Sequence, residues 1–127
     1  MSNKKTQWLA MGPVNAYFGF CGSEKAYLKT MKKIGVSDPC DFVSSGAGAT
    51  VHTISNGGTP TFLMCIDVEA AKLNYTRNQI DALVCHEASH VAQGCVEEMN
   101  AKGERELFAY IAQYVFGFAA KTIWGDI

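Results

Sequence analysis

The start of a long helix at Thr76 is the most constraining feature of this sequence. Gln79 follows Thr76 at the third position, and in such a capping box each side chain bonds to the backbone N–H of the other residue. This fixes where the helix begins and therefore which of its residues share a face. We expect the helix to contain "DALVCHEASHVAQG", residues 81–94, and to finish near Met99.

A second helix is predicted at the end of the chain, in "ERELFAYIAQYVFGFAAKTIW", residues 104–124. The segment is apolar around most of its circumference, which is typical of a buried or interface helix. Charged residues near both ends and Gln113 in the middle leave its apolar length too short for a bilayer crossing. The short link "NAKG", residues 100–103, allows the two helices to pack antiparallel.

The first half of the chain predicts a strand, a helix and a β-hairpin. Residues 14–21 alternate aromatic and small side chains, and residues 24–34 repeat apolar side chains at helical spacing after Ser23, a plausible N-cap. The hairpin spans about residues 50–68 and turns at Asn56-Gly57. We therefore expect a single α+β domain over residues 1–127, in which a short antiparallel sheet packs on the helices.

The composition limits the kinds of partner and the cellular compartment that we expect for this chain. The formal net charge is -1 and 48% of the residues are hydrophobic, so no basic surface predicts a nucleic-acid partner. The first 21 residues lack the apolar run of a signal peptide, which favours the cytoplasm. The odd number of cysteines and their irregular spacing indicate reduced core thiols rather than disulfides. They are Cys21, Cys40, Cys65, Cys85 and Cys95.

The segment "HEASH" predicts a zinc site. His86 and His90 project from the same face of a helix one turn apart, so that both imidazoles can bind one metal ion. Glu87 lies beside them and would act as general base and acid on a water molecule. The short pattern also occurs by chance in ordinary helices, but three ionisable residues in one turn of a buried helix need a neutralising partner.

The third zinc ligand has to come from elsewhere in the chain. Gln93 and Val96 stand where the metzincin pattern needs glycine and histidine, so that class is excluded. We expect Glu106, on the returning helix, to bind the metal. Its rivals are the carboxylates of Glu104, Glu97 and Glu98, and Glu104 at a helix start also suits the helix dipole.

Three further residues are candidates for the site. Tyr110 and Gln113 share a predicted helix face with Glu106, so Tyr110 could donate to an oxyanion and Gln113 could orient a ligand. A lone tyrosine or histidine is more often structural. His52 lies on the predicted hairpin, where "TVHTI" or "TFLMCID" could be the edge that holds a substrate by backbone pairing.

The segments "SEKAYLKTMKKIGV", "GATVHTI", "LVCHEASHVAQ" and "ELFAYIAQ" together resemble a family of small uncharacterised proteins encoded by bacteriophages and prophages. Their general form is "LLVHEAVHVWQ" followed by "EFEAYSIQ". The resemblance implies a minimal gluzincin, in which two histidines and a distant glutamate hold zinc, and it places that glutamate at Glu106. It also implies the cytoplasm of a bacterial host.

The sequence therefore predicts a zinc-dependent metallopeptidase with His86, His90 and Glu106 as metal ligands and Glu87 and Tyr110 as catalytic groups. Its substrate would be a peptide or protein. The alternative is a non-catalytic protein whose zinc serves structure or interaction. A homo-oligomer formed through the apolar C-terminal helix is a further expectation.

Overall fold

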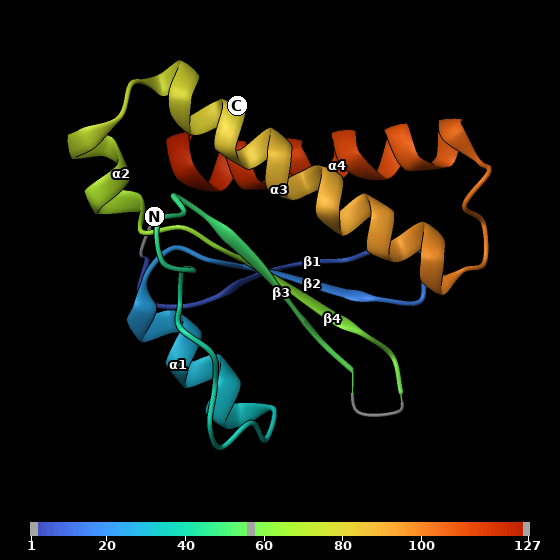
Figure 1. The fold of residues 1–127 in the computed structure, drawn as a ribbon, viewed down its shortest axis with the longest axis horizontal. Helices are drawn as coiled ribbons and strands as arrows, with labels where there is room; N and C mark the ends of the chain where they lie inside the picture. Colours follow the sequence, from blue (N-terminus) through green and yellow to red (C-terminus); the bar gives the residue numbers. More distant parts are fainter. Residues whose placement is uncertain (1–2, 56–57, 126–127) are drawn as a thin grey trace.

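The computed structural model describes residues 3–55 and 58–125. Within these ranges, four strands and four helices make up one α+β domain, as the sequence predicts (Figure 1). The strands are β1 (Gln7–Leu9), β2 (Tyr17–Cys21), β3 (Thr50–Ile54) and β4 (Thr61–Cys65). The helices are α1 (Glu24–Lys33), α2 (Val68–Asn74), α3 (Arg77–Glu98) and α4 (Arg105–Trp124).

The sheet has the order β1-β2-β4-β3 and is mixed, so the prediction of a purely antiparallel sheet is wrong. β2 and β4 run parallel, with Phe18 opposite Phe62, whereas β3 pairs antiparallel with β4 as the hairpin predicts. The burial pattern explains the order. β2 and β4 are almost continuously buried and occupy the centre, whereas the less buried β3 lies at an edge. The predicted turn at Asn56-Gly57 lies outside the described residues.

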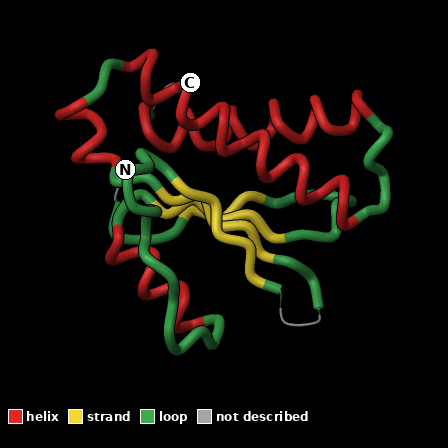
Figure 2. Tube along the Cα trace, viewed as in Figure 1, coloured by secondary structure: helices red, strands yellow, loops and turns green. Residues whose placement is uncertain are grey.

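The sheet separates two layers of helices (Figures 1 and 2). Alternate side chains of the central strands, such as Phe18 and Phe62, pack against α3 and α4. The intervening side chains, such as Leu63, pack under α1 against Tyr27 and Met31. Contacts with the sheet place α3 over β3 and β4, and α4 over β1. The pair α3 and α4 thus covers one apolar face of the sheet, and α1 covers the other.

Local capping confirms the predicted helix starts. The side chains of Thr76 and Gln79 form the reciprocal capping box at the start of α3. The side chain of Ser23 accepts a hydrogen bond from the Ala26 N–H at the start of α1. Gly35, at φ 93°, follows the end of α1 in a left-handed conformation that favours glycine. The short elements β1 and α2 were not predicted.

The antiparallel packing of α3 and α4 is also confirmed, and it has a defined register. The Trp124 Nε1–H donates a hydrogen bond of 2.9 Å to Asp81 Oδ1, which places the end of α4 beside the start of α3. Ile111 and Val115 of α4 pack into the core against α3 and the sheet. No helix in the described ranges is long and apolar enough to cross a membrane.

All five cysteines are free thiols, but only three of them are core residues. Cys21, Cys65 and Cys95 are buried, which agrees with the sequence prediction. Cys40 and Cys85 are exposed.

Candidate metal centre

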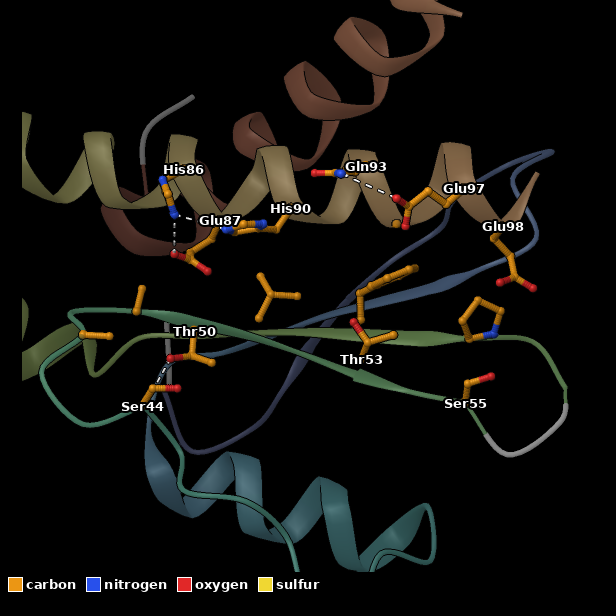
Figure 3. Close-up of a pocket in the computed structure, with 16 residues that line it drawn as sticks. Ser44, Thr50, Thr53, Ser55, His86, Glu87, His90, Gln93, Glu97 and Glu98 are labelled. Atoms are coloured by element: carbon orange, nitrogen blue, oxygen red, sulfur yellow. Dashed lines mark hydrogen bonds and ion pairs between the residues drawn. The ribbon is translucent and has the colours of Figure 1, made fainter. Parts of the chain in front are cut away.

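His86 and His90 lie side by side on the exposed flank of α3 (Figure 3). Their Nε2 atoms are 3.1 Å apart, and the two rings meet edge to face with centroids separated by 4.7 Å. The side chain of His86 is 68% exposed, so the pair is open to solvent. The one-turn spacing of the two histidines therefore brings two ring nitrogens to one point, as the sequence predicts.

The separation of these nitrogens fits a shared metal ion. Zinc binds imidazole nitrogens at about 2.0–2.1 Å with tetrahedral angles, which places two such nitrogens about 3.3 Å apart. The 3.1 Å separation also suits a hydrogen bond between a protonated and an unprotonated ring nitrogen. The separation of the two nitrogens is thus compatible with two imidazoles on one metal ion.

Glu87 lies on the buried side of the same turn. It is 6% exposed, and its Oε2 is 4.0 Å from the Nε2 of His86. Burial raises the pKa of the Glu87 carboxyl, while the two imidazoles and a hydrogen bond from the backbone of Val51 in β3 offset part of that rise. A carboxyl with a raised pKa, held beside two imidazoles, is suited to take up and release a proton.

The three residues line a cavity of about 700 Å³ between α3 and β3 (Figure 3). β3 and the residue after it supply one wall, which includes Thr53 and Ser55. α3 supplies the other wall, where the Gln93 Nε2 donates a hydrogen bond of 3.5 Å to Glu97 Oε2. Of the two segments that the sequence proposed as a substrate edge, "TVHTI" is the edge strand and "TFLMCID" is not.

Gly94 sets how closely α3 approaches the sheet. A Cβ atom at this position would lie 2.5 Å from Cε1 of Phe62, far inside van der Waals contact. α3 remains helical through Gly94 and beyond it to Glu98. The glycine therefore serves close packing rather than a break in the helix, and it holds the histidine pair beside β3.

The structure does not bring Glu106, Tyr110 or Gln113 to the histidines. Tyr110 and Gln113 share one face of α4, as predicted, but that face borders a separate cavity of about 830 Å³ beside residues 9–13. Tyr110 is 65% exposed there. Within residues 3–55 and 58–125, no cluster of three or more histidine, cysteine or acidic side chains is arranged to hold a metal ion. The predicted three-ligand site is thus not assembled.

Helix register and rotation explain this separation. With Trp124 beside Asp81, antiparallel pairing places Glu106 beside the far end of α3. At 1.5 Å per residue, that position, opposite residue 99, lies about 13.5 Å along the axis from His90. The core contacts of Ile111 and Val115 also turn the Glu106 face away from α3.

The other candidates of the sequence have distinct places. Glu104 is the N-cap residue of α4 and makes no side-chain capping bond. Glu97 and Glu98 line the histidine cavity, but Glu97 follows His90 by two helical turns, about 10 Å along the axis. His52 lies outside the cavity lining, because its Nε2 is 3.0 Å from the Phe42 carbonyl oxygen and its ring stacks on Tyr27.

Sequence reasoning missed the contact that ties the helix to the strand. The Val51 amide reaches Glu87 from an edge strand, and no side-chain pattern in the sequence signals a backbone donor. The sequence indicated this contact only indirectly, because Val51 lies on "TVHTI", the segment proposed as a substrate edge beside the active helix.

No protein-family model matches the chain, and no curated protein sequence or solved structure is significantly similar to it. The resemblance to small phage-encoded gluzincin-like proteins consequently stays a prediction.

Proposed function

We propose that this protein is a zinc-dependent hydrolase of peptide bonds, with His86 and His90 as metal ligands and Glu87 as general base and acid. The observation that carries the proposal is the pair of Nε2 atoms 3.1 Å apart with the buried Glu87 carboxylate 4.0 Å from one of them. All three side chains line one cavity beside an edge strand. Two imidazoles are borderline ligands that favour zinc among the common divalent ions.

The edge strand supplies a means of holding an extended peptide. In an antiparallel pair, the backbone groups of alternate residues of β3 point away from β4. Val51 is one of these residues, since its backbone bonds to Glu87, and Thr53 and Ser55 follow at the same alternation. A substrate strand paired at Thr53 would pass along the cavity toward Glu87 and the histidines.

The chain's own residues then act on the bound peptide. Zinc at the two histidines would polarise the peptide carbonyl and lower the pKa of a water molecule. Glu87 accepts the proton of the attacking water and delivers it to the leaving amine nitrogen, and the Val51 N–H keeps its carboxylate oriented between the steps. The free thiols fit an activity in the reducing cytoplasm, including that of a bacterial host.

The proposal does not rely on Glu106 or Tyr110, because both lie away from the histidines. A site with two protein ligands binds zinc more weakly than one with three. Isothermal titration should therefore give the same zinc affinity for Glu106→Gln, for the matched control Glu104→Gln and for the wild-type chain. A loss confined to Glu106→Gln would show that α4 moves when the metal binds.

A non-catalytic zinc-binding protein is the second candidate function. The specific observation in its favour is that no third protein ligand lies beside the histidines within the described residues. In that case zinc would serve to fix a surface for a partner rather than to activate water. Glu87 separates the two candidates, because only hydrolysis needs its proton transfer.

The test combines metal binding with turnover of a mixed fluorogenic peptide library. His90→Ala should abolish zinc binding and hydrolysis together, whereas Glu87→Gln should retain zinc and lose hydrolysis by at least about 100-fold. Hydrolysis that persists in Glu87→Gln would refute the assigned role of Glu87. A wild-type chain that binds zinc without cleaving any library peptide would support the second candidate, and a folded chain that takes up no zinc would refute both.

A further inference from the structure

One exposed face of α4 is unusual in both its composition and its order. The face points away from the core stripe that contains Ile111 and Val115, and it borders the cavity beside residues 9–13. Its two large side chains, Tyr110 and Tyr114, are 65% and 52% exposed. The face consists of Glu106, Tyr110, Gln113, Tyr114, Gly117 and Lys121.

The order of these residues is self-complementary. A two-fold axis that passes between residues 113 and 114 would place a second copy of the face antiparallel to the first. The two residue numbers in each contacting pair would then have the same sum. The resulting pairs are Glu106 with Lys121, Tyr110 with Gly117, and Gln113 with Tyr114. Each acid meets a base, the ring of Tyr110 meets a residue without a side chain, and the amide of Gln113 meets the phenol of Tyr114.

The local geometry suits this pairing. Nothing lies within 4 Å of the position that a Cβ atom would occupy at Gly117, so the surface is open where the ring of Tyr110 would enter. Tyr114 is already oriented, because its hydroxyl donates a hydrogen bond of 2.8 Å to the Ala10 carbonyl oxygen. The spacing of Glu106, Tyr110, Gln113 and Gly117, at alternating steps of four and three, is that of a helix-pairing seam.

The simpler explanation for the two charges is the helix dipole, since Glu106 lies in the first turn of α4 and Lys121 in the last. That explanation accounts for the signs but not for the exposed tyrosines between them or for the open glycine. No ion pair within the described residues engages either charge. Both charges therefore remain available to a second copy.

We propose that the protein forms a two-fold symmetric dimer in which α4 packs antiparallel against α4 of a second copy through this face. The dimer is independent of the hydrolase proposal. α4 covers the β1 side of the sheet, whereas the histidine cavity opens beside β3 at the opposite edge, so pairing through α4 leaves the histidine cavity of each copy accessible (Figure 1).

Sedimentation velocity of the full chain, from about 1 µM to about 1 mM, tests the dimer. The wild-type chain should dimerise reversibly in this range. Lys121→Glu and Glu106→Lys should each weaken dimerisation by at least about 10-fold, because each places like charges opposite one another at both ends of the seam. The double variant Glu106→Lys/Lys121→Glu restores both ion pairs, so its dimerisation should return to within about 3-fold of the wild type.

Two controls keep the result specific. Glu104→Lys alters the dipole at the same helix end but lies off the face, so it should leave dimerisation unchanged. Gly117→Leu fills the open position and should abolish dimerisation while circular dichroism shows a folded chain. A wild-type chain that stays monomeric at about 1 mM, or a double variant as weak as the single ones, would overturn the proposal. Monomeric behaviour would leave the face to a partner of another kind.

Discussion

The substitution Gly94→Ala sets two physical effects against each other in the helix that carries the histidines. Alanine is favoured over glycine in a helix interior by about 1 kcal/mol. At this position, however, the new methyl group would lie 2.5 Å from Cε1 and 2.8 Å from Cζ of Phe62, whose ring is 2% exposed. Overpacking of a core costs about 1–3 kcal/mol, and the short distances from the new methyl group to two ring carbons place the cost in the upper half of that range. We therefore expect the free energy of unfolding to fall by about 1–2 kcal/mol.

Gly117→Ala is the matched control, because Gly117 lies in the interior of α4 with nothing within 4 Å of a Cβ atom. It should raise the free energy of unfolding by about 1 kcal/mol. Urea unfolding followed by circular dichroism at dilute, monomeric protein measures both values. Equal stabilisation by the two substitutions would refute the conclusion that Gly94 sets the distance between α3 and the sheet.

Three other predictions concern residues in or near the site. Glu87→Gln should raise the free energy of unfolding of the metal-free chain by about 1 kcal/mol at neutral pH, because an amide replaces a buried carboxylate; urea unfolding that shows a loss would contradict this. His52→Ala should lower the free energy of unfolding by about 1–2 kcal/mol, because the stacking on Tyr27 is lost. The same substitution should leave the zinc affinity measured by titration unchanged. A loss of zinc affinity would show that His52 belongs to the site. Burial raises the pKa of Tyr27 from 10.0 to about 12, so stability should be retained below pH 10 and fall as the pH rises toward 12, where the unfolded phenol ionises first. Across this pH range, the free energy of unfolding should fall less steeply in Tyr27→Phe than in the wild-type chain. An identical slope would count against the raised pKa of Tyr27.

The elements that could be predicted are those fixed by neighbouring residues. The capping box of Thr76 and Gln79 and the N-cap at Ser23 act over one helical turn, so the sequence alone locates α3 and α1. The three residues of β1 are too few to show a periodicity, and the parallel pairing of β2 with β4 depends on contacts far apart in the chain. Local signals consequently located α1 and α3 but not α2 or the order of the strands.

The same distinction divides the candidate site. His86 and His90 are brought together by the pitch of a single helix, which the sequence predicts directly. Glu106 would have to be positioned by the rotation and register of a second helix. The polar stripe that contains Glu106 was taken to face α3, but Ile111 and Val115 form the stripe that is buried instead. An amphipathic reading of α4, with its polar stripe outward, would have identified the exposed face.

The position of Glu87 is the feature that favours hydrolysis over a purely structural metal. The buried stripe of α3 contains Ile80, Val84, Val91 and Cys95, and Glu87 occupies the place between them where a helix of purely structural function would carry another apolar side chain. A zinc ion held by two exposed histidines for a structural purpose does not require an acid in the core beside it. A buried carboxylate lowers stability, and the Val51 backbone and the two imidazoles offset only part of the effect of burial. In the proposed function, proton transfer to a substrate in that cavity would use the burial, the backbone hydrogen bond and the nearby imidazoles together.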